Sequence, residues 1–236
     1  MIPIYDDNPT RRFTWVTLFL IGLNIGAFGY MLSLGDAELS AFIAERAFVA
    51  GDFFADPTDP HRLLTLFTAM FLHAGWLHLG GNMLYLWIFG NNVEERLGHG
   101  RFVLFYLTAG VVATLVQSAT APDSTIPLVG ASGAIAGILG AYMWLFPRAR
   151  VVTLIPVLFI VEIAAIPAVF VIGFWFLLQV VQGVGSIGMI EGGVAWWAHV
   201  AGFVFGLAVA IPITVFGRGP RAATSRRVRR SARRDR

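Results

Sequence analysis

The chain has 236 residues, of which 57% are hydrophobic and 13% are charged. Soluble domains usually carry about 25% charged residues. This composition and the mean hydropathy of +0.72 therefore exclude an ordinary soluble domain and indicate a polytopic membrane protein. The sequence contains no cysteine, which excludes disulfides, thiolate metal sites and cysteine nucleophiles.

The chain opens with a short polar segment, residues 1–12, that ends in Arg11 and Arg12. Residues 13–34 then run for 22 positions without a charge, about 33 Å as a helix and long enough to span a bilayer. This run is longer than the apolar core of a signal peptide and lacks a small-x-small cleavage site, so we expect a retained first span. A polar loop follows at 36–62, with six acidic residues against two arginines.

Five further spans are expected along the chain. Residues 63–90 lack a formal charge over 28 positions, too many for one perpendicular helix, so we divide them into a membrane-embedded loop, 63–75, and a second span, 76–89. Pro156 and Glu162 interrupt 151–166 and Pro167 follows it, so we interpret this stretch as an interfacial or re-entrant segment. The other spans are predicted at 102–121, 132–146, 166–183 and 196–216.

The distribution of arginines predicts the orientation, because basic residues favour cytoplasmic loops. With six spans, the arginines at 11–12 and at 148 and 150 and those of the tail all lie inside, and the acidic loop lies outside. A seventh span at 151–166 would move the tail outside. We therefore predict an all-α, six-helix membrane domain over 13–217, with a partly embedded first loop and with both termini inside.

The C-terminal tail, 218–236, carries nine of the seventeen arginines and a single aspartate. A run of like charge of this kind is typical of a disordered segment that anchors the topology and touches anionic lipid. Nucleic-acid binding is the alternative for such a tail, and we do not expect it here.

The predicted topology brings polar residues from three spans to one depth. Spans two, four and six all enter the membrane from the outer face, and their first turns carry His78 and Asn82, Ser132, and His199 respectively. Polar side chains inside a membrane are costly and usually mark a functional site. The sequence therefore predicts one site near the outer surface.

Ser132 belongs to the motif Gly130-Ala131-Ser132-Gly133 at the start of the fourth span. One interpretation is structural, because Gly133, Gly137 and Ala141 form a small-xxx-small ridge that permits close helix packing. The other is that Ser132 is a nucleophile. Gly130 permits unusual backbone angles, and the free N–H groups of a helix start favour an oxyanion. The two interpretations are compatible.

His199 is followed on the same helix face by Gly202 and Gly206. A histidine inside a membrane needs a partner, so it is either a structural residue bonded to a carbonyl or a general base for a nucleophile on a neighbouring helix. The glycines mark its face as tightly packed, with span four as the expected neighbour. No Asp or Glu lies at this depth, so we predict a Ser132–His199 dyad rather than a triad.

His78 and Asn82 lie four residues apart and share one helix face. They are either donors that polarise a carbonyl and hold its oxyanion, or partners in interhelical hydrogen bonds. A metal site formed by His73, His78 and His199 is a third possibility. The chain lacks an H-E-x-x-H motif and a carboxylate base, so we expect no metal and no cofactor.

Taken together, the motifs over roughly 60–210 resemble the rhomboid family of intramembrane serine proteases. They are His78-x-x-x-Asn82, Glu94-Glu95-Arg96-x-Gly98, Gly130-Ala131-Ser132-Gly133 and Ala198-His199-x-x-Gly202-x-x-x-Gly206. The resemblance implies a six-helix core, with Ser132 as nucleophile and His199 as base. It also implies an oxyanion hole formed by His78, Asn82 and the Ser132 N–H, a half-embedded element beside span two, and a lateral gate at span five. Some members place a tyrosine four residues after the serine, stacked on the histidine. Here that position is Ala136, so the support of His199 is left open.

From the residues and the resemblance together we expect an intramembrane serine endopeptidase. Its substrates would be transmembrane proteins with helix-weakening residues and a small residue before the cut. The alternative is a non-catalytic member that binds transmembrane helices. A transporter is less consistent with the absence of a buried acid for ion coupling. The expected location is a bacterial inner membrane, with the site towards the outer face.

Overall fold

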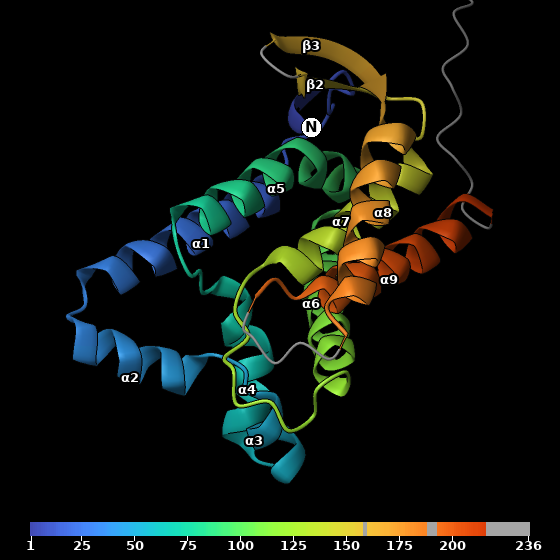
Figure 1. The fold of residues 1–236 in the computed structure, drawn as a ribbon. Helices are drawn as coiled ribbons and strands as arrows, with labels where there is room; N and C mark the ends of the chain where they lie inside the picture. The colour runs from blue at the N-terminus through green and yellow to red at the C-terminus, as the bar shows by residue number, and fades with distance from the viewer. Residues whose placement is uncertain (158–159, 188–192, 216–236) are drawn as a thin grey trace, which may run out of the picture.

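The computed structural model describes residues 1–157, 160–187 and 193–215, and in this part of the chain it is mostly helical (Figure 1). The predicted basic tail, 218–236, lies outside the described residues. The helices are α1 (Trp15–Ser33), α2 (Asp36–Arg46), α3 (Ala50–Ala55), α4 (Pro60–Thr68), α5 (Trp76–Leu97), α6 (His99–Ala119), α7 (Ser132–Leu145), α8 (Ala168–Gly185) and α9 (Trp196–Val215), with a short 3₁₀ helix, η1 (Ala69–Phe71). The strands are β1 (Ile2–Asp6), β2 (Arg150–Val157) and β3 (Ile160–Pro167).

Helices occupy all six of the segments predicted as spans, but they differ in length. Among the described residues, α1, α6, α8 and α9 are each long and apolar enough to cross a membrane. The α4–η1 segment and α5 meet the same test together and are bent by 82° at their junction. Helix α7 has 14 residues, about 21 Å, which is shorter than the roughly 30 Å hydrocarbon core. The structure thus has four to five candidate spans, and the count of six stays a prediction.

The acidic segment predicted as a loop at 36–62 contains two helices, α2 and α3. Helix α2 begins after Gly35, whose N–H donates to the Glu38 carboxylate at 3.2 Å. Helix α4 begins after Asp59, whose side chain accepts from the His61 N–H at 2.9 Å. Proline occupies the first position of this helix. An acidic cap and a proline in the first turn are typical helix starts.

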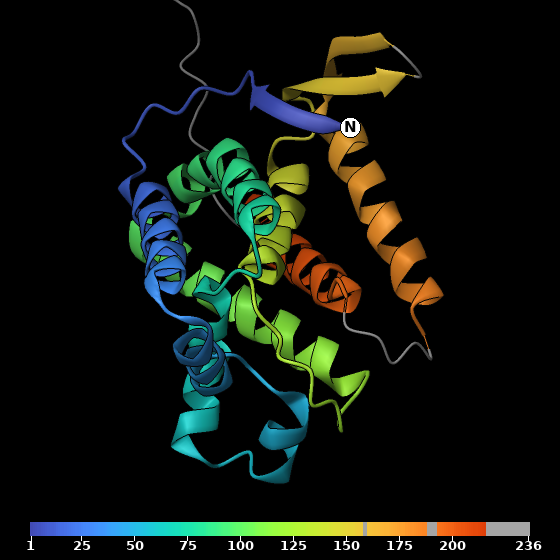
Figure 2. The same ribbon diagram turned by 60° about the vertical axis from the view of Figure 1, so that its left-hand side comes forward.

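The fold is mostly helical as predicted, but the prediction that it is all-α was wrong, because residues 150–157 and 160–167 form two β-strands. Strands β2 and β3 pair antiparallel, with Arg150 opposite Pro167 and Pro156 opposite Val161. Strand β1 lies within residues 1–12, which were predicted only as a short polar segment. It pairs antiparallel with the other side of β2. Figure 2 shows this three-stranded sheet at one end of the helices. The β-branched residues of β2 favour an extended backbone, and hydropathy alone does not distinguish such a run from a membrane segment.

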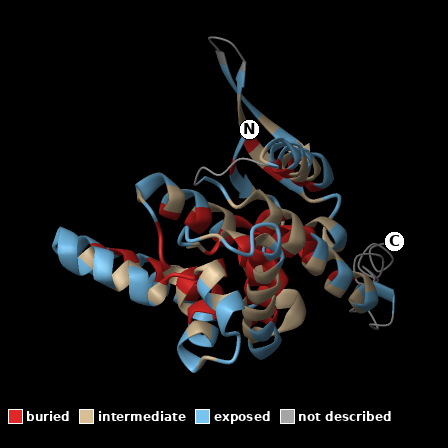
Figure 3. Cartoon of the chain, turned by 60° about the horizontal axis from the view of Figure 1, so that its bottom comes forward, coloured by how far each residue is buried: buried red, intermediate tan, exposed pale blue. Residues whose placement is uncertain are grey.

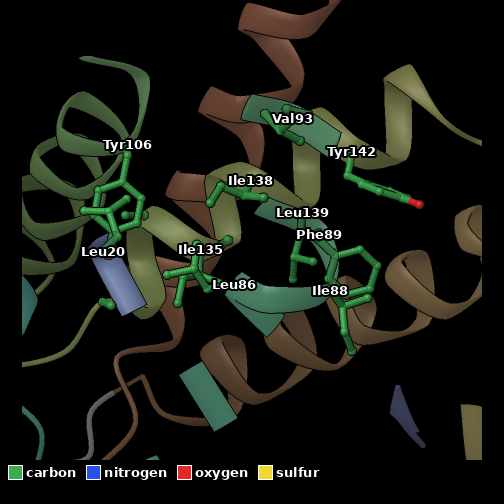
Figure 4. Close-up of a cluster of buried hydrophobic side chains, with 14 of the residues drawn as sticks. Leu20, Leu86, Ile88, Phe89, Val93, Tyr106, Ile135, Ile138, Leu139 and Tyr142 are labelled. Carbon is green, nitrogen blue, oxygen red and sulfur yellow. The ribbon is translucent and has the colours of Figure 1, made fainter. Parts of the chain in front are cut away.

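Helix α7 lies at the centre of the molecule, packed among α5, α6 and α9. Residues 133–142 of this helix are all buried. Buried residues gather in the middle of the helical bundle, shown in red in Figure 3. Figure 4 shows Ile138 and Leu139 of α7 among Leu86, Phe89 and Val93 of α5. Because α7 is enclosed by other helices, its position is fixed along its length, including its first residue, Ser132.

Glu94 of α5 holds the start of α1. Its buried carboxylate accepts from the Val16 N–H at 3.1 Å, the Thr17 N–H at 2.7 Å and the Thr17 hydroxyl at 2.6 Å. A negative group at a helix N-terminus satisfies N–H groups that have no partner within the helix. His99 begins α6, and its Nδ1 lies 2.6 Å from the same carboxylate.

Candidate active site

Ser132 is the first residue of α7, and the loop before it has a conformation that glycine permits. Gly130 has φ +125°, in the region that residues with a Cβ rarely adopt. A Cβ at this position would lie 2.7 Å from His78 Nε2 and 3.8 Å from Ser132 Oγ. The Gly130 N–H also donates to the Ala69 carbonyl at 2.9 Å, which ties the loop to η1. The close approach of the Gly130 backbone to the His78 ring therefore requires glycine.

Helix α5 contributes His78 and Asn82 on one face. His78 is half-buried, and its Nδ1 lies 3.4 Å from the Ala74 N–H. Asn82 is buried, and its Nδ2 lies 2.9 Å from His73 Nε2. An amide nitrogen only donates, so His73 Nε2 is the acceptor in this bond.

The contact of His73 with Asn82 was not predicted from the sequence, because His73 was considered only as a possible metal ligand. Within the described ranges, no group of three or more His, Cys, Asp or Glu side chains is close enough to hold a metal. The signal for its structural contact was its place in the apolar segment just before α5, where a buried imidazole needs a partner.

Helices α7 and α9 cross in close contact along their glycines. A Cβ on Gly202 would overlap the Gly133 carbonyl oxygen, and one on Gly206 would overlap the Gly137 carbonyl oxygen. A Cβ on Gly137 would also lie 2.8 Å from the Ala109 Cβ of α6. The backbones of the two helices therefore touch, as small-xxx-small faces allow. Since His199 lies one turn before Gly202, its turn of α9 lies against the first turn of α7.

His199 is buried and has a partner from α8. Its Nδ1 lies 2.8 Å from Oε1 of Gln179, whose own Nε2 donates to the Trp175 carbonyl at 3.0 Å. The Trp175 ring lies 5.8 Å from the imidazole, centroid to centroid, and the Trp196 ring lies 6.2 Å away. Gln179 was not predicted from the sequence, because only Asp and Glu were considered as partners that would orient His199. A polar amide inside an apolar predicted span was the available signal.

A family model described as "Rhomboid domain" matches residues 60–216, which include all of these side chains. The chain belongs to the rhomboid family. This rhomboid is an integral membrane protein with several apolar helices. In this rhomboid, the position where some members place a stacking tyrosine is Ala136, which is fully buried.

Several characterised proteins are similar to this rhomboid. It is 38% identical over 130 residues to the rhomboid protease GluP of Bacillus subtilis, a match that covers 54% of this chain and 24% of GluP. It is 32% identical over 118 residues to the mitochondrial presenilin-associated rhomboid-like protein A of Danio rerio, which covers 49% of this chain and 31% of that protein. A shorter match, 38% over 80 residues, is to the putative rhomboid protease YdcA of Bacillus subtilis, covering 34% and 40% of the two chains. The matches thus span well under half the length of these relatives.

Proposed function

We propose that this rhomboid is an intramembrane serine endopeptidase that cleaves transmembrane segments of other membrane proteins. The observation that carries the proposal is the contact of Gly202 with the Gly133 carbonyl, which joins the turn that holds His199 to the turn that begins with Ser132. His78 reaches the same turn from α5, across Gly130. A hydroxyl, an imidazole and hydrogen-bond donors around one helix start are the parts of an acyl-transfer site.

In the proposed reaction, His199 Nε2 accepts the Ser132 hydroxyl proton as Oγ attacks the carbonyl carbon of the scissile peptide bond. The C–N bond then breaks, the imidazolium returns its proton to the leaving amine, and an acyl ester remains on Ser132. Water adds to this ester with His199 again as base, which releases the new carboxyl group and restores the hydroxyl. A cavity of about 20 Å³ lined by Ser132, Gly133 and Ala198 has room for about one water molecule.

Three donors are proposed to hold the oxyanion of the tetrahedral intermediate. They are the Ser132 N–H at the start of α7, the His78 side chain and the Asn82 amide. Asn82 has two N–H bonds on Nδ2, so the one given to His73 leaves a second for the substrate. Each such donor lowers the barrier by roughly 3–4 kcal/mol in enzymes of this chemistry.

We further propose six spans with both termini inside, the site towards the outer face, and a bacterial inner membrane as the location. Arg150 lies in the sheet at the end of α7 opposite Ser132, and the Arg11 N–H bonds to Glu95 near the far end of α5. The acidic segment lies at the Ser132 end, where the Gly51 N–H donates to Ser124 in the loop that precedes α7. The arginines at the end opposite Ser132 agree with the positive-inside rule.

The chain without cysteine suits a direct test of this orientation. Single cysteines at Asp56, in the acidic segment, and at Ala149, before β2, are labelled with a membrane-impermeant maleimide in intact spheroplasts. We expect label at position 56 without permeabilisation and at position 149 only after it. The reverse pattern would refute the proposed orientation.

The enzymatic proposal is tested by cleavage of a membrane-anchored reporter in liposomes. Ser132→Ala and His199→Ala are expected to abolish cleavage, while Ser118→Ala, a buried serine on α6 bonded to the Thr114 carbonyl, is the matched control and should cleave normally. Fluorophosphonate should label the wild type and not Ser132→Ala. If the wild type and all three variants bind the reporter without cleaving it, the protein is instead a non-catalytic member that captures transmembrane helices.

A further inference from the structure

We propose that Gln179 of α8 is the positioning residue of the catalytic base, because its Oε1 binds His199 Nδ1 and leaves Nε2 as the basic nitrogen of the ring. The inference rests on the proposed function of Ser132 and His199, and it identifies the third group that orients the dyad in place of an acid. The bond joins two helices, since Gln179 comes from α8 and His199 from α9.

The first step of the argument is the orientation of the Gln179 amide. Its Nε2 donates to the Trp175 carbonyl one turn earlier at 3.0 Å, and a carbonyl oxygen only accepts. The amide nitrogen is therefore committed to Trp175, and Oε1 faces His199 at 2.8 Å. A flipped amide would leave two acceptors facing each other at the Trp175 carbonyl.

The second step is the tautomer of His199. Amide Oε1 is an acceptor, so the imidazole nitrogen beside it carries the proton, and a neutral ring then has its lone pair on Nε2. This is the tautomer that a general base needs to take a proton from a serine hydroxyl. Both side chains are less than a tenth exposed, so water does not compete freely for either atom.

The third step is what happens when His199 gains the proton. The Nδ1–H bond to Gln179 persists in the imidazolium, and the carbonyl dipole of the amide stabilises the new charge without burying a second one. The Trp175 ring, 5.8 Å away, lies within cation–π range of the ring in this state. Helix α8 thus supplies both the hydrogen bond and an aromatic neighbour that Ala136 of α7 does not.

The test measures cleavage and the tautomer of His199 separately. Gln179→Leu removes the acceptor, and we expect kcat to fall about 10- to 100-fold with little change in KM. Gln182→Leu, an exposed glutamine three residues later on the same helix, is the matched control and should leave kcat unchanged. Gln179→Asn, one methylene shorter, keeps the amide but cannot reach His199 and Trp175 together, so kcat should fall as it does in Gln179→Leu.

The tautomer is observed by ¹⁵N NMR of histidine-labelled protein, with His199→Ala to assign the signal. We expect the Nδ1–H form in the wild type and a mixture or the other form in Gln179→Leu. This readout does not depend on protease activity, so it separates a failure of the proposed function from a failure of this inference. A wild-type tautomer and wild-type kcat in Gln179→Leu would overturn the inference even if Ser132 and His199 prove essential. A change in tautomer would support it even in a chain that cleaves nothing.

Discussion

Substitution of Gly202 by alanine tests the contact on which the candidate site depends. Its Cβ would overlap the Gly133 carbonyl oxygen, whereas real Cβ atoms essentially never come within 3.0 Å of another heavy atom. Because the obstacle is backbone at the centre of a closely packed helix pair, a side-chain rotation does not relieve the overlap. Helices α7 and α9 must separate by about 1 Å, which is the scale at which overpacking costs about 1–3 kcal/mol.

The effect on catalysis is expected to exceed the effect on folding. His199 and Ser132 lie on the two backbones that are forced apart, and a 1 Å error in the position of reacting groups costs about 10²-fold in rate. The assay is reporter cleavage in liposomes together with thermal unfolding in detergent. The matched control is Gly173→Ala on α8, where a Cβ meets nothing within 4 Å and a small gain in helix stability is expected. Cleavage by Gly202→Ala at the wild-type rate would refute the view that this contact sets the geometry of the dyad.

Three further predictions concern residues around the site and at its far end. His73→Phe keeps a ring but removes the acceptor for Asn82 Nδ2, so kcat should fall about 10-fold. The loss should not add to that of Asn82→Ala, and full additivity in the double variant would contradict a shared role. Glu94→Gln replaces one carboxylate oxygen with an NH₂ group, which cannot accept from the Thr17 N–H and hydroxyl of α1. The free energy of unfolding should fall by about 1–3 kcal/mol. Glu95→Gln should cost less, because Glu95 accepts only from the exposed N–H groups of Arg11 and Arg12, and equal losses would argue against the cap. Burial raises the pKa of Asp6 above its ordinary 3.8, so its share of stability is present below pH 3.8 and is lost as pH rises through the raised pKa. The wild type should therefore lose stability relative to Asp6→Asn as pH rises above about 4, as measured by Tm in detergent, and a constant difference would contradict this linkage.

The helices at the six predicted spans followed from hydropathy and charge, but the end of the second one did not. Span two was predicted to end at residue 89, before Glu94 and Arg96, whereas α5 continues to Leu97. The charges suggested an exit from the membrane because a buried carboxylate is costly without partners. Glu94 has those partners in the first turn of α1, 77 and 78 residues earlier in the chain. Such a contact is long-range and leaves no local pattern.

The sheet escaped prediction for a related reason. Val151, Val152 and Thr153 carried a local signal for a strand, but the segment was interpreted by its charge and length as a membrane-interface element. Strand β1 has only five residues, and its partner β2 follows α7, far along the chain. A strand this short is stabilised by its neighbour more than by its own propensity.

The sequence predicted the motif residues of the candidate site but not the residues that support them. Ser132, His199, His78 and Asn82 stand out as polar groups at one depth on apolar helices. Gln179 and His73 lie at similar positions, yet their importance comes from which atom each one faces. Gln179 bonds to His199, 20 residues later in the sequence, and His73 bonds to Asn82, nine residues later. Those orientations depend on the packing of α8 and on the path of the chain before α5.

The sheet also imposes an order on synthesis. Strand β1 is translated before β2, and the N–H of Arg150, which bonds to the Asp7 carboxylate beside β1, comes 143 residues later. Through the insertion of α1, α5, α6 and α7 the N-terminal strand therefore remains without its partner, and pairing of distant segments is the slow part of folding. Tyr142, at the far end of the Ser132 helix, also bonds to Asp6. Strand β1 is thus made early and paired late, and Asp6 at its end contacts α7.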